Sequence, residues 1–285
     1  MSKSGDLEFY NKEKKNLSGN KSNIKKVILI VVGAIFVLFA LVLFLVPRIV
    51  IYHQAKQVTA ELGPAAEYFT EFDLTLPDEE PVREVTFDGM TVTIPGYLKN
   101  ERSVFGNSCI YEEPLEDGKT GGRSVIIVTM DVSDTNSYLE EMITEKVEGP
   151  LGKYAVKQLM KGYEDLGNGI PENNYAMEKS YYLLKEEDYS FWNWKQGFAY
   201  IINGVLKKET SFICDYTYVY EKEDISGFIH VDGRTDHAQS DSSGYSYRVT
   251  ARMYSVNDYS TEHALLIRCD SLETAYAIIN SAKIE

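Results

Sequence analysis

The chain has 285 residues, of which 44% are hydrophobic and 25% are charged, and its net charge at neutral pH is −14. This composition is typical of a folded protein with enough residues for one or two domains and a sizeable core. The acidic balance excludes nucleic acid as an expected partner, because the phosphate backbone would be repelled.

The charge is distributed unevenly along the chain. Residues 1–26 hold seven lysines and three acidic residues, a net charge of +4, whereas residues 47–285 hold 22 basic and 40 acidic residues, a net charge of −18. The N-terminal segment is also rich in Ser, Asn and Gly. We therefore predict that residues 1–26 form a basic, disordered tail.

The segment Val27–Val46 contains twenty residues without a charged or polar side chain. As a helix it would span about 30 Å, the thickness of the hydrocarbon core of a bilayer. The apolar region of a cleaved signal peptide is shorter, about 7–15 residues, and no cleavage site of small residues follows closely. We predict an uncleaved transmembrane helix over residues 27–47. A cleaved signal peptide and a buried core helix are the alternatives, although a core helix usually has a polar face.

The flanking charges predict the orientation of this helix. Lys21, Lys25 and Lys26 precede it directly, and the nearest basic residues on the other side are Arg48 and Lys56. Because positive charge is retained in the cytoplasm, the N-terminus is expected there and the C-terminal part is expected to be extracytoplasmic. The chain is thus predicted to be a single-pass protein of the plasma membrane.

Residues 48–81 are predicted to form a juxtamembrane helix and linker. The sequence is compatible with a helix until Gly63-Pro64, a pair that breaks or kinks helices. The acidic segment Thr75–Pro81 is bounded by prolines and is typical of a linker. The extracytoplasmic domain is therefore predicted to span residues 82–285.

The domain is predicted to begin with strands and continue with helices. Apolar and polar residues alternate on both sides of Asp88-Gly89, which is a strong signal for a β-hairpin. A further strand is expected at residues 109–113, and Val125–Met130 is apolar enough to be buried on both faces. Residues 133–208 are interpreted as a mostly helical insertion.

The last part of the domain returns to strands. Alternating patterns predict strands at residues 212–221, 227–231, 244–256 and 263–270. Residues 271–284 are predicted to form an amphipathic helix capped by Ser271. The order indicates an α+β fold with an antiparallel sheet packed with helices.

The segments "FDGMTVTIPGYLKNERS", "RSVIIVTMDVSD" and "HALLIRCDSLETAYAIINSAKI" are similar to the opening hairpin and the closing strand and helix of PsbP-like domains. The resemblance covers residues 82–132 and 210–285 and implies a sandwich of a central antiparallel sheet between helices. The helical insertion departs from the family pattern. The resemblance implies a fold and a tendency toward non-enzymatic roles, but no ligand and no functional residue.

Motifs for nucleotide binding, nucleophilic catalysis or zinc proteolysis do not occur in the sequence. No catalytic residue and no cofactor are therefore predicted, and the chain is interpreted as more consistent with a binding protein than with an enzyme. The three cysteines, Cys109, Cys214 and Cys269, allow one disulfide, but buried thiols are equally compatible.

Two groups of side chains are candidate binding residues. A dense polar cluster offers oxygen and nitrogen ligands for a metal ion, although the same residues are also typical of a long solvated turn: His230, Asp232, Asp236 and His237. A second group combines aromatic and basic side chains that form either a ligand-binding surface or part of the core: Trp192, Trp194, Tyr216, Tyr218, Arg248 and Arg252.

These features favour a membrane-anchored extracytoplasmic domain that binds or assembles with an envelope partner, either a protein or a cell-wall polymer. Its membrane contact would be the lipid bilayer around Val27–Val46. The alternative is a cell-envelope hydrolase with an unrecognised carboxylate or Cys–His site.

Overall fold

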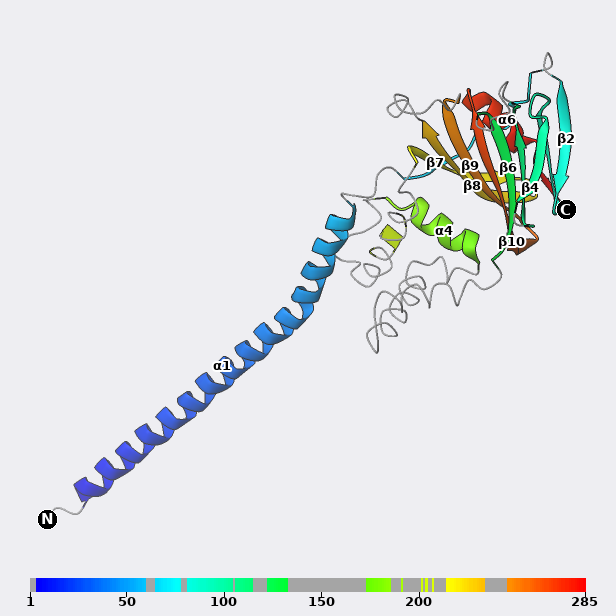
Figure 1. The fold of residues 1–285 in the computed structure, drawn as a ribbon. Coiled ribbons are helices and arrows are strands. Elements are labelled where there is room, and N and C mark those ends of the chain that lie inside the picture. Colours follow the sequence, from blue (N-terminus) through cyan, green and yellow to red (C-terminus); the bar gives the residue numbers. More distant parts are fainter. Residues whose placement is uncertain are drawn as a thin grey trace. The chain divides into compact units, whose positions relative to one another are not determined.

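The computed structural model describes residues 4–59, 65–77, 81–104, 106–114, 122–132, 173–185, 191, 201, 203–204, 207, 214–233 and 245–285. The chain forms two compact units, Met1–His53 and Gln54–Glu285. The first is dominated by a single long helix, and the second contains the β-sheets (Figure 1).

The helix α1 extends over Ser4–Thr59. Its segment Lys26–Val58 includes a window with a mean hydropathy of 3.4, and no residue of that window is buried against the rest of the chain. The segment is long and apolar enough to cross a membrane. The predicted apolar helix is therefore confirmed, and its full exposure argues against the core-helix alternative.

The prediction of a disordered tail over residues 1–26 is wrong for most of that segment, since α1 begins at Ser4. The physical reason is helix elongation. Starting a helix is costly, whereas extending an existing one adds a hydrogen bond for each residue fixed. The first proline of the chain is Pro47, so nothing upstream of it interrupts the helix that the apolar segment establishes.

The unit Gln54–Glu285 contains strands and helices in the order of an α+β fold, which confirms the predicted class. The strands are β1 (Glu67–Tyr68), β2 (Val82–Phe87), β3 (Met90–Pro95), β4 (Asn100–Val104), β5 (Ser108–Glu112), β6 (Ser124–Asp131), β7 (Tyr216–Lys222), β8 (Ile225–Gly233), β9 (Tyr247–Ser255), β10 (Asp258–Cys269) and β11 (Lys283–Ile284). The helices α4 (Asn174–Tyr182) and α6 (Leu272–Asn280) belong to the same unit.

Eight of these strands form one large sheet in the order β1-β7-β8-β9-β10-β6-β5-β4. Neighbouring strands within this sheet are antiparallel, except that β1 and β7 pair in parallel. The sheet is thus mixed, and the expectation of a purely antiparallel sheet is wrong at this edge. Short hairpins force strands to be antiparallel, but β1 and β7 are far apart in sequence, so no hairpin sets their direction.

The hairpin predicted around Asp88-Gly89 is confirmed as β2 and β3, which form a second sheet with β11. Asp88 and Gly89 have φ values of 45° and 80°, as a two-residue hairpin turn of this type requires. Gly and Asp adopt this region more readily than most residues, which explains why the dipeptide marks the turn.

The main core lies between the large sheet, the small sheet and α6. Its buried side chains alternate along each strand, as in Val249, Ala251 and Met253 of β9. Ser271 caps α6 by accepting a hydrogen bond from the backbone N–H of Thr274 at 3.2 Å, as the sequence predicts. The face of the large sheet that packs against α6 is therefore formed by every second residue of its strands.

A smaller core lies on the opposite face of the large sheet. Tyr175 and Tyr182 of α4 pack there against Val219 of β7, Phe228 of β8 and Tyr254 of β9. Most of the predicted insertion at residues 133–208 lies outside the described residues, and α4 is its described helix.

One further strand prediction differs from the structure, and one strand of the structure is not predicted from the sequence. Ile126 and Val128 of β6 are only half-buried, so the expectation of burial on both faces is wrong. The described helix on that face, α4, packs over β7, β8 and β9 instead. Strand β4 was not predicted, because its sequence, Asn100–Val104, is mostly polar and exposed.

Candidate functional site

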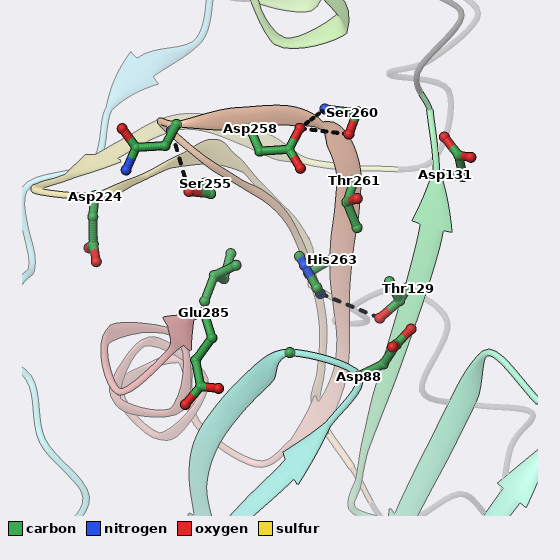
Figure 2. A pocket seen from close by; sticks show the side chains of 13 residues that line it. Asp88, Thr129, Asp131, Asp224, Ser255, Asp258, Ser260, Thr261, His263 and Glu285 are labelled. Atoms are coloured by element: carbon green, nitrogen blue, oxygen red, sulfur yellow. Dashed lines mark hydrogen bonds between the residues drawn. The ribbon is translucent and has the colours of Figure 1, made fainter.

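A pocket of about 810 Å³ opens at one end of the large sheet, on the face that packs against α6 (Figure 2). Its walls are formed by the turns of three hairpins, by the ends of β6 and β10, and by the residues at and after β11. The volume is in the range of pockets that bind small molecules or a few side chains of a partner.

Carboxylate side chains line this pocket, and each comes from a different turn or strand end: Asp88, Asp131, Asp224, Asp258 and Glu285. No Lys or Arg is among the described lining residues. Among the described lining residues, the remaining titratable side chain is a histidine, so these residues give the pocket a negative potential at neutral pH.

Turn chemistry explains why acidic residues gather here. Asp88 occupies the positive-φ position of the β2–β3 turn, and Asp224 follows Glu223, whose φ is 42° in the β7–β8 turn. The carboxylate of Asp258 accepts hydrogen bonds from the backbone N–H of Ser260 at 2.8 Å and from its hydroxyl at 2.6 Å. These bonds hold the pKa of Asp258 below its usual value. The turns of the hairpins β2–β3, β7–β8 and β9–β10 line the same pocket, so their acidic residues lie near one another.

His263 of β10 lies in the centre of the lining, as Figure 2 shows. Its side chain is only 4% exposed, and its Nδ1 atom lies 3.4 Å from the hydroxyl of Thr129 on β6. Burial lowers the pKa of His263, although Asp88 and Asp258 oppose this shift. The imidazole is therefore neutral at neutral pH. No described residue forms a hydrogen bond with its other ring nitrogen.

The described part of the chain contains no group of three His, Cys, Asp or Glu side chains close enough to hold a metal ion. The carboxylates of the described pocket residues therefore do not converge on one point.

A second charged cluster lies on the opposite face of the sheet, beneath α4. Arg252 of β9 contacts Glu178 of α4 with N–O distances of 2.6 and 2.8 Å, and it contacts Glu262 of β10 at 2.8 and 2.5 Å. Glu178 and Glu262 are buried. All three charges are engaged with one another, so this cluster attaches the helix to the sheet.

Arg252 is the shared counter-charge of Glu178 and Glu262, and the pKa values of these two carboxylates shift in opposite directions. Glu262 also accepts a hydrogen bond from the hydroxyl of Tyr254, and hydrogen bonding and charge hold its pKa below the usual value despite burial. Burial raises the pKa of Glu178 to about 7, with a smaller contribution from the neighbouring Glu262 charge.

The structure also brings together a cysteine and a histidine. The Sγ atom of Cys214 lies 3.8 Å from Nδ1 of His230, and Thr217 contacts both atoms. Burial raises the pKa of Cys214 and lowers that of His230 to about 4. Both groups are therefore neutral, whereas a cysteine nucleophile requires a lowered thiol pKa.

The four described residues of the predicted aromatic and basic group do not form one surface. Tyr216 is 60% exposed, but Tyr218 packs against Phe69 and Tyr276. Arg252 is paired beneath α4, whereas Arg248 lies opposite Asp232 of β8 in the sheet register. Trp192 and Trp194 lie outside the described residues.

The predicted metal ligands are only partly described. His230 and Asp232 lie two residues apart on β8, and Asp236 and His237 lie outside the described residues. That site therefore stays a prediction. The cysteines are all described, and no disulfide joins any two of them.

Sequence reasoning did not find the acidic pocket, because its carboxylates are separated by up to 197 positions in the chain (88 to 285). Each belongs to a turn or strand end, where an acidic residue is ordinary. The available signal was the repeated placement of Asp in predicted hairpin turns, which becomes informative only when the topology places these turns together.

No known family model matches this chain, and no curated protein matches it significantly.

Proposed function

We propose that this protein is a single-pass membrane protein whose acidic C-terminal unit lies outside the cytoplasm and binds an envelope partner without catalysing a reaction. The observation that carries the proposal is the pocket at the end of the large sheet, which is lined by five carboxylates and by no described Lys or Arg. A negatively charged, concave surface favours binding of a positively charged group of a partner.

Membrane anchoring is supported by the exposed apolar segment of α1 and by its flanks. The side chain of Arg48 donates a hydrogen bond to the carbonyl of Phe44 at 2.6 Å, and its guanidinium lies 3.4 Å from the ring centre of Phe44. The first cation after the apolar stretch thus lies along the helix surface, as expected near a membrane boundary. The lysines before Val27 favour a cytoplasmic N-terminus and insertion in the plasma membrane.

Binding is favoured over catalysis by the electrostatics of the other clusters. Glu178 and Glu262 are paired with Arg252 beneath a helix, and Cys214 and His230 are both held neutral by burial. A hydrolase remains the second candidate because the Cys214–His230 distance of 3.8 Å is compatible with a dyad, but the pKa directions disfavour it.

We further propose a fold related to PsbP-like domains. The opening hairpin β2–β3, the central sheet and the closing helix α6 correspond to the segments on which the sequence resemblance rests. The edge strand β1, which is parallel to β7, is a departure from a purely antiparallel sheet.

The membrane topology and the binding of an envelope partner are tested by two experiments. Protease treatment of intact cells should degrade the unit Gln54–Glu285 and spare the N-terminus, and mass spectrometry should find no mature start after Pro47. Full-length protein in detergent should then capture an envelope component, and the double variant Asp88→Asn/Asp224→Asn should lose it. Protection of the domain, or capture that is unchanged in the variant, would contradict the proposal.

A further inference from the structure

Two buried carboxylates share one arginine beneath α4. Glu178 of α4 is 6% exposed and Glu262 of β10 is 1% exposed, and the guanidinium of Arg252 on β9 contacts both of them. When both acids are ionised, these three side chains carry a net charge of −1. Burying an uncompensated charge is costly, because the protein interior solvates ions poorly. The composition of this cluster therefore favours the binding of one proton, which makes it neutral.

A single nitrogen atom of Arg252 holds the two carboxylates close together. Its Nη2 atom lies 2.8 Å from Oε1 of Glu178 and 2.5 Å from Oε2 of Glu262. These two oxygens are therefore at most 5.3 Å apart, the sum of the two distances. Two negative charges at this separation repel each other, as in carboxylate pairs that hold one proton between them. This repulsion is removed when one of the two acids is protonated.

The hydrogen bonds indicate which acid holds the proton. Glu262 accepts a hydrogen bond from the hydroxyl of Tyr254 as well as those from Arg252, and such bonds favour the charged form of a carboxylate. Among the described side chains, Glu178 accepts hydrogen bonds from Arg252 alone. In agreement, the pKa of Glu178 is raised to about 7, whereas that of Glu262 is lowered. Glu178 is therefore the residue that binds the proton.

The other described titratable groups around α4 do not supply a second positive charge to the cluster. His230 of β8 is neutral at neutral pH, because burial lowers its pKa to about 4. Lys179 of α4 pairs with Glu221 of β7 at 2.6 Å. Lys207 donates a hydrogen bond to the carbonyl of Leu184, beyond the end of α4, at 3.5 Å. Among the described residues, Arg252 is thus the cation that contacts both buried acids.

We propose that this cluster is a pH switch that controls how firmly α4 is held on the large sheet. With Glu178 protonated, the cluster is neutral and the helix packs closely on the sheet. Loss of the proton leaves a negative charge in the interface, and opening of the helix relieves this cost because it exposes Glu178 to water. Opening also uncovers Val219 and Phe228, the apolar residues on which α4 packs. The switch lies on the face of the sheet opposite the acidic pocket and does not depend on the proposed binding function.

The direction of the switch follows from the proton affinities of the two states. In the open state Glu178 has its ordinary pKa of 4.5, and in the closed state its pKa is about 7. The closed state binds the proton more tightly, so its advantage is fully present below about pH 4.5 and is lost as the pH rises through about 7. Between about pH 5.5 and about pH 8, the ratio of open to closed helix should increase at least about tenfold.

The experiment is hydrogen–deuterium exchange of the full chain in detergent, measured by mass spectrometry at these two pH values. Exchange rates are normalised to those of unstructured peptides at the same pH, which removes the intrinsic pH dependence of exchange. Peptides that contain α4 should be protected at least about tenfold less at the higher pH. Exchange of α4 at low urea concentrations should also depend on urea less than exchange of α6, because a local opening exposes less surface than unfolding does.

Two variants remove one carboxylate each and test the composition of the cluster. Glu178→Gln cannot ionise, so protection of α4 should become the same at both pH values. Glu262→Gln leaves one carboxylate for one arginine, so Glu178 stays ionised over this range and the pH dependence should again disappear. The matched control is Glu273→Gln, which neutralises an exposed acid of α6 and should keep the pH dependence of the wild type.

Three results would overturn the inference. The first is equal protection of α4 at both pH values in the wild type, and the second is a pH dependence that persists in either cluster variant. The third is the same urea dependence of exchange in α4 and α6, which would show that α4 opens only when the whole domain unfolds. Because the two cluster variants change residues on different elements, the test does not rely on the folding of one of them.

Discussion

Arg252 on β9 donates hydrogen bonds to both carboxylate oxygens of Glu178 on α4, at distances of 2.6 and 2.8 Å, although the two residues are 74 positions apart. The same guanidinium contacts the buried Glu262 on the neighbouring strand. The position of α4 on the sheet is therefore specified by a directional contact in addition to its tyrosines.

Removing the arginine should destabilise the folded domain strongly. In Arg252→Met two buried carboxylates lose their counter-charge, and breaking a buried ion pair in this way costs about 3–5 kcal/mol. The free energy of unfolding from urea titration measures the loss. The matched control is Arg102→Met, which breaks an exposed ion pair with Glu112 and should cost less than about 1 kcal/mol. Equal losses in the two variants would contradict the role of the cluster.

The raised pKa of Glu178 predicts a pH dependence of stability. The folded state binds this proton more tightly than the unfolded state, because burial raises the pKa from 4.5 to about 7. The contribution is fully present below about pH 4.5 and is lost as the pH rises through about 7. Urea titrations of the wild type and Glu178→Gln across this range should show the wild type losing stability relative to the variant. Parallel curves would show that Glu178 does not titrate there.

Gly227 of β8 should not tolerate a side chain. A Cβ atom at this position would lie 2.1 Å from the carbonyl oxygen of Arg252, in the neighbouring strand. Gly227→Ala must therefore separate β8 from β9, at a cost of about 3 kcal/mol or more in the free energy of unfolding. Gly33→Ala is the control, because its added Cβ has no atom within 4 Å, and it should leave unfolding of the domain unchanged.

The cysteines should react slowly in the folded protein. Cys109 and Cys269 are buried, and burial raises the pKa of Cys269 to about 12. Cys214 is more accessible, but its pKa is also raised. Titration with a thiol reagent should therefore modify Cys214 first and more slowly than free cysteine, and the unfolded protein should show three thiols without reductant. Faster modification of Cys214 than of free cysteine would favour the hydrolase alternative, and Cys214→Ser identifies the signal.

Local patterns in the sequence determined the apolar helix, the Asp88-Gly89 hairpin, the strands of the C-terminal half and the Ser271 cap, because each depends on residues close together in the chain. The α+β class follows from their order. Tertiary structure decided the parallel pairing of β1 with β7, the burial of Arg252 and the gathering of carboxylates around His263. Alternation places Arg252 on a face of its strand but does not say what covers that face. The pocket exists because the sheet topology places turns that are distant in the sequence at one end of the sheet. No local sequence pattern predicts which turns become neighbours.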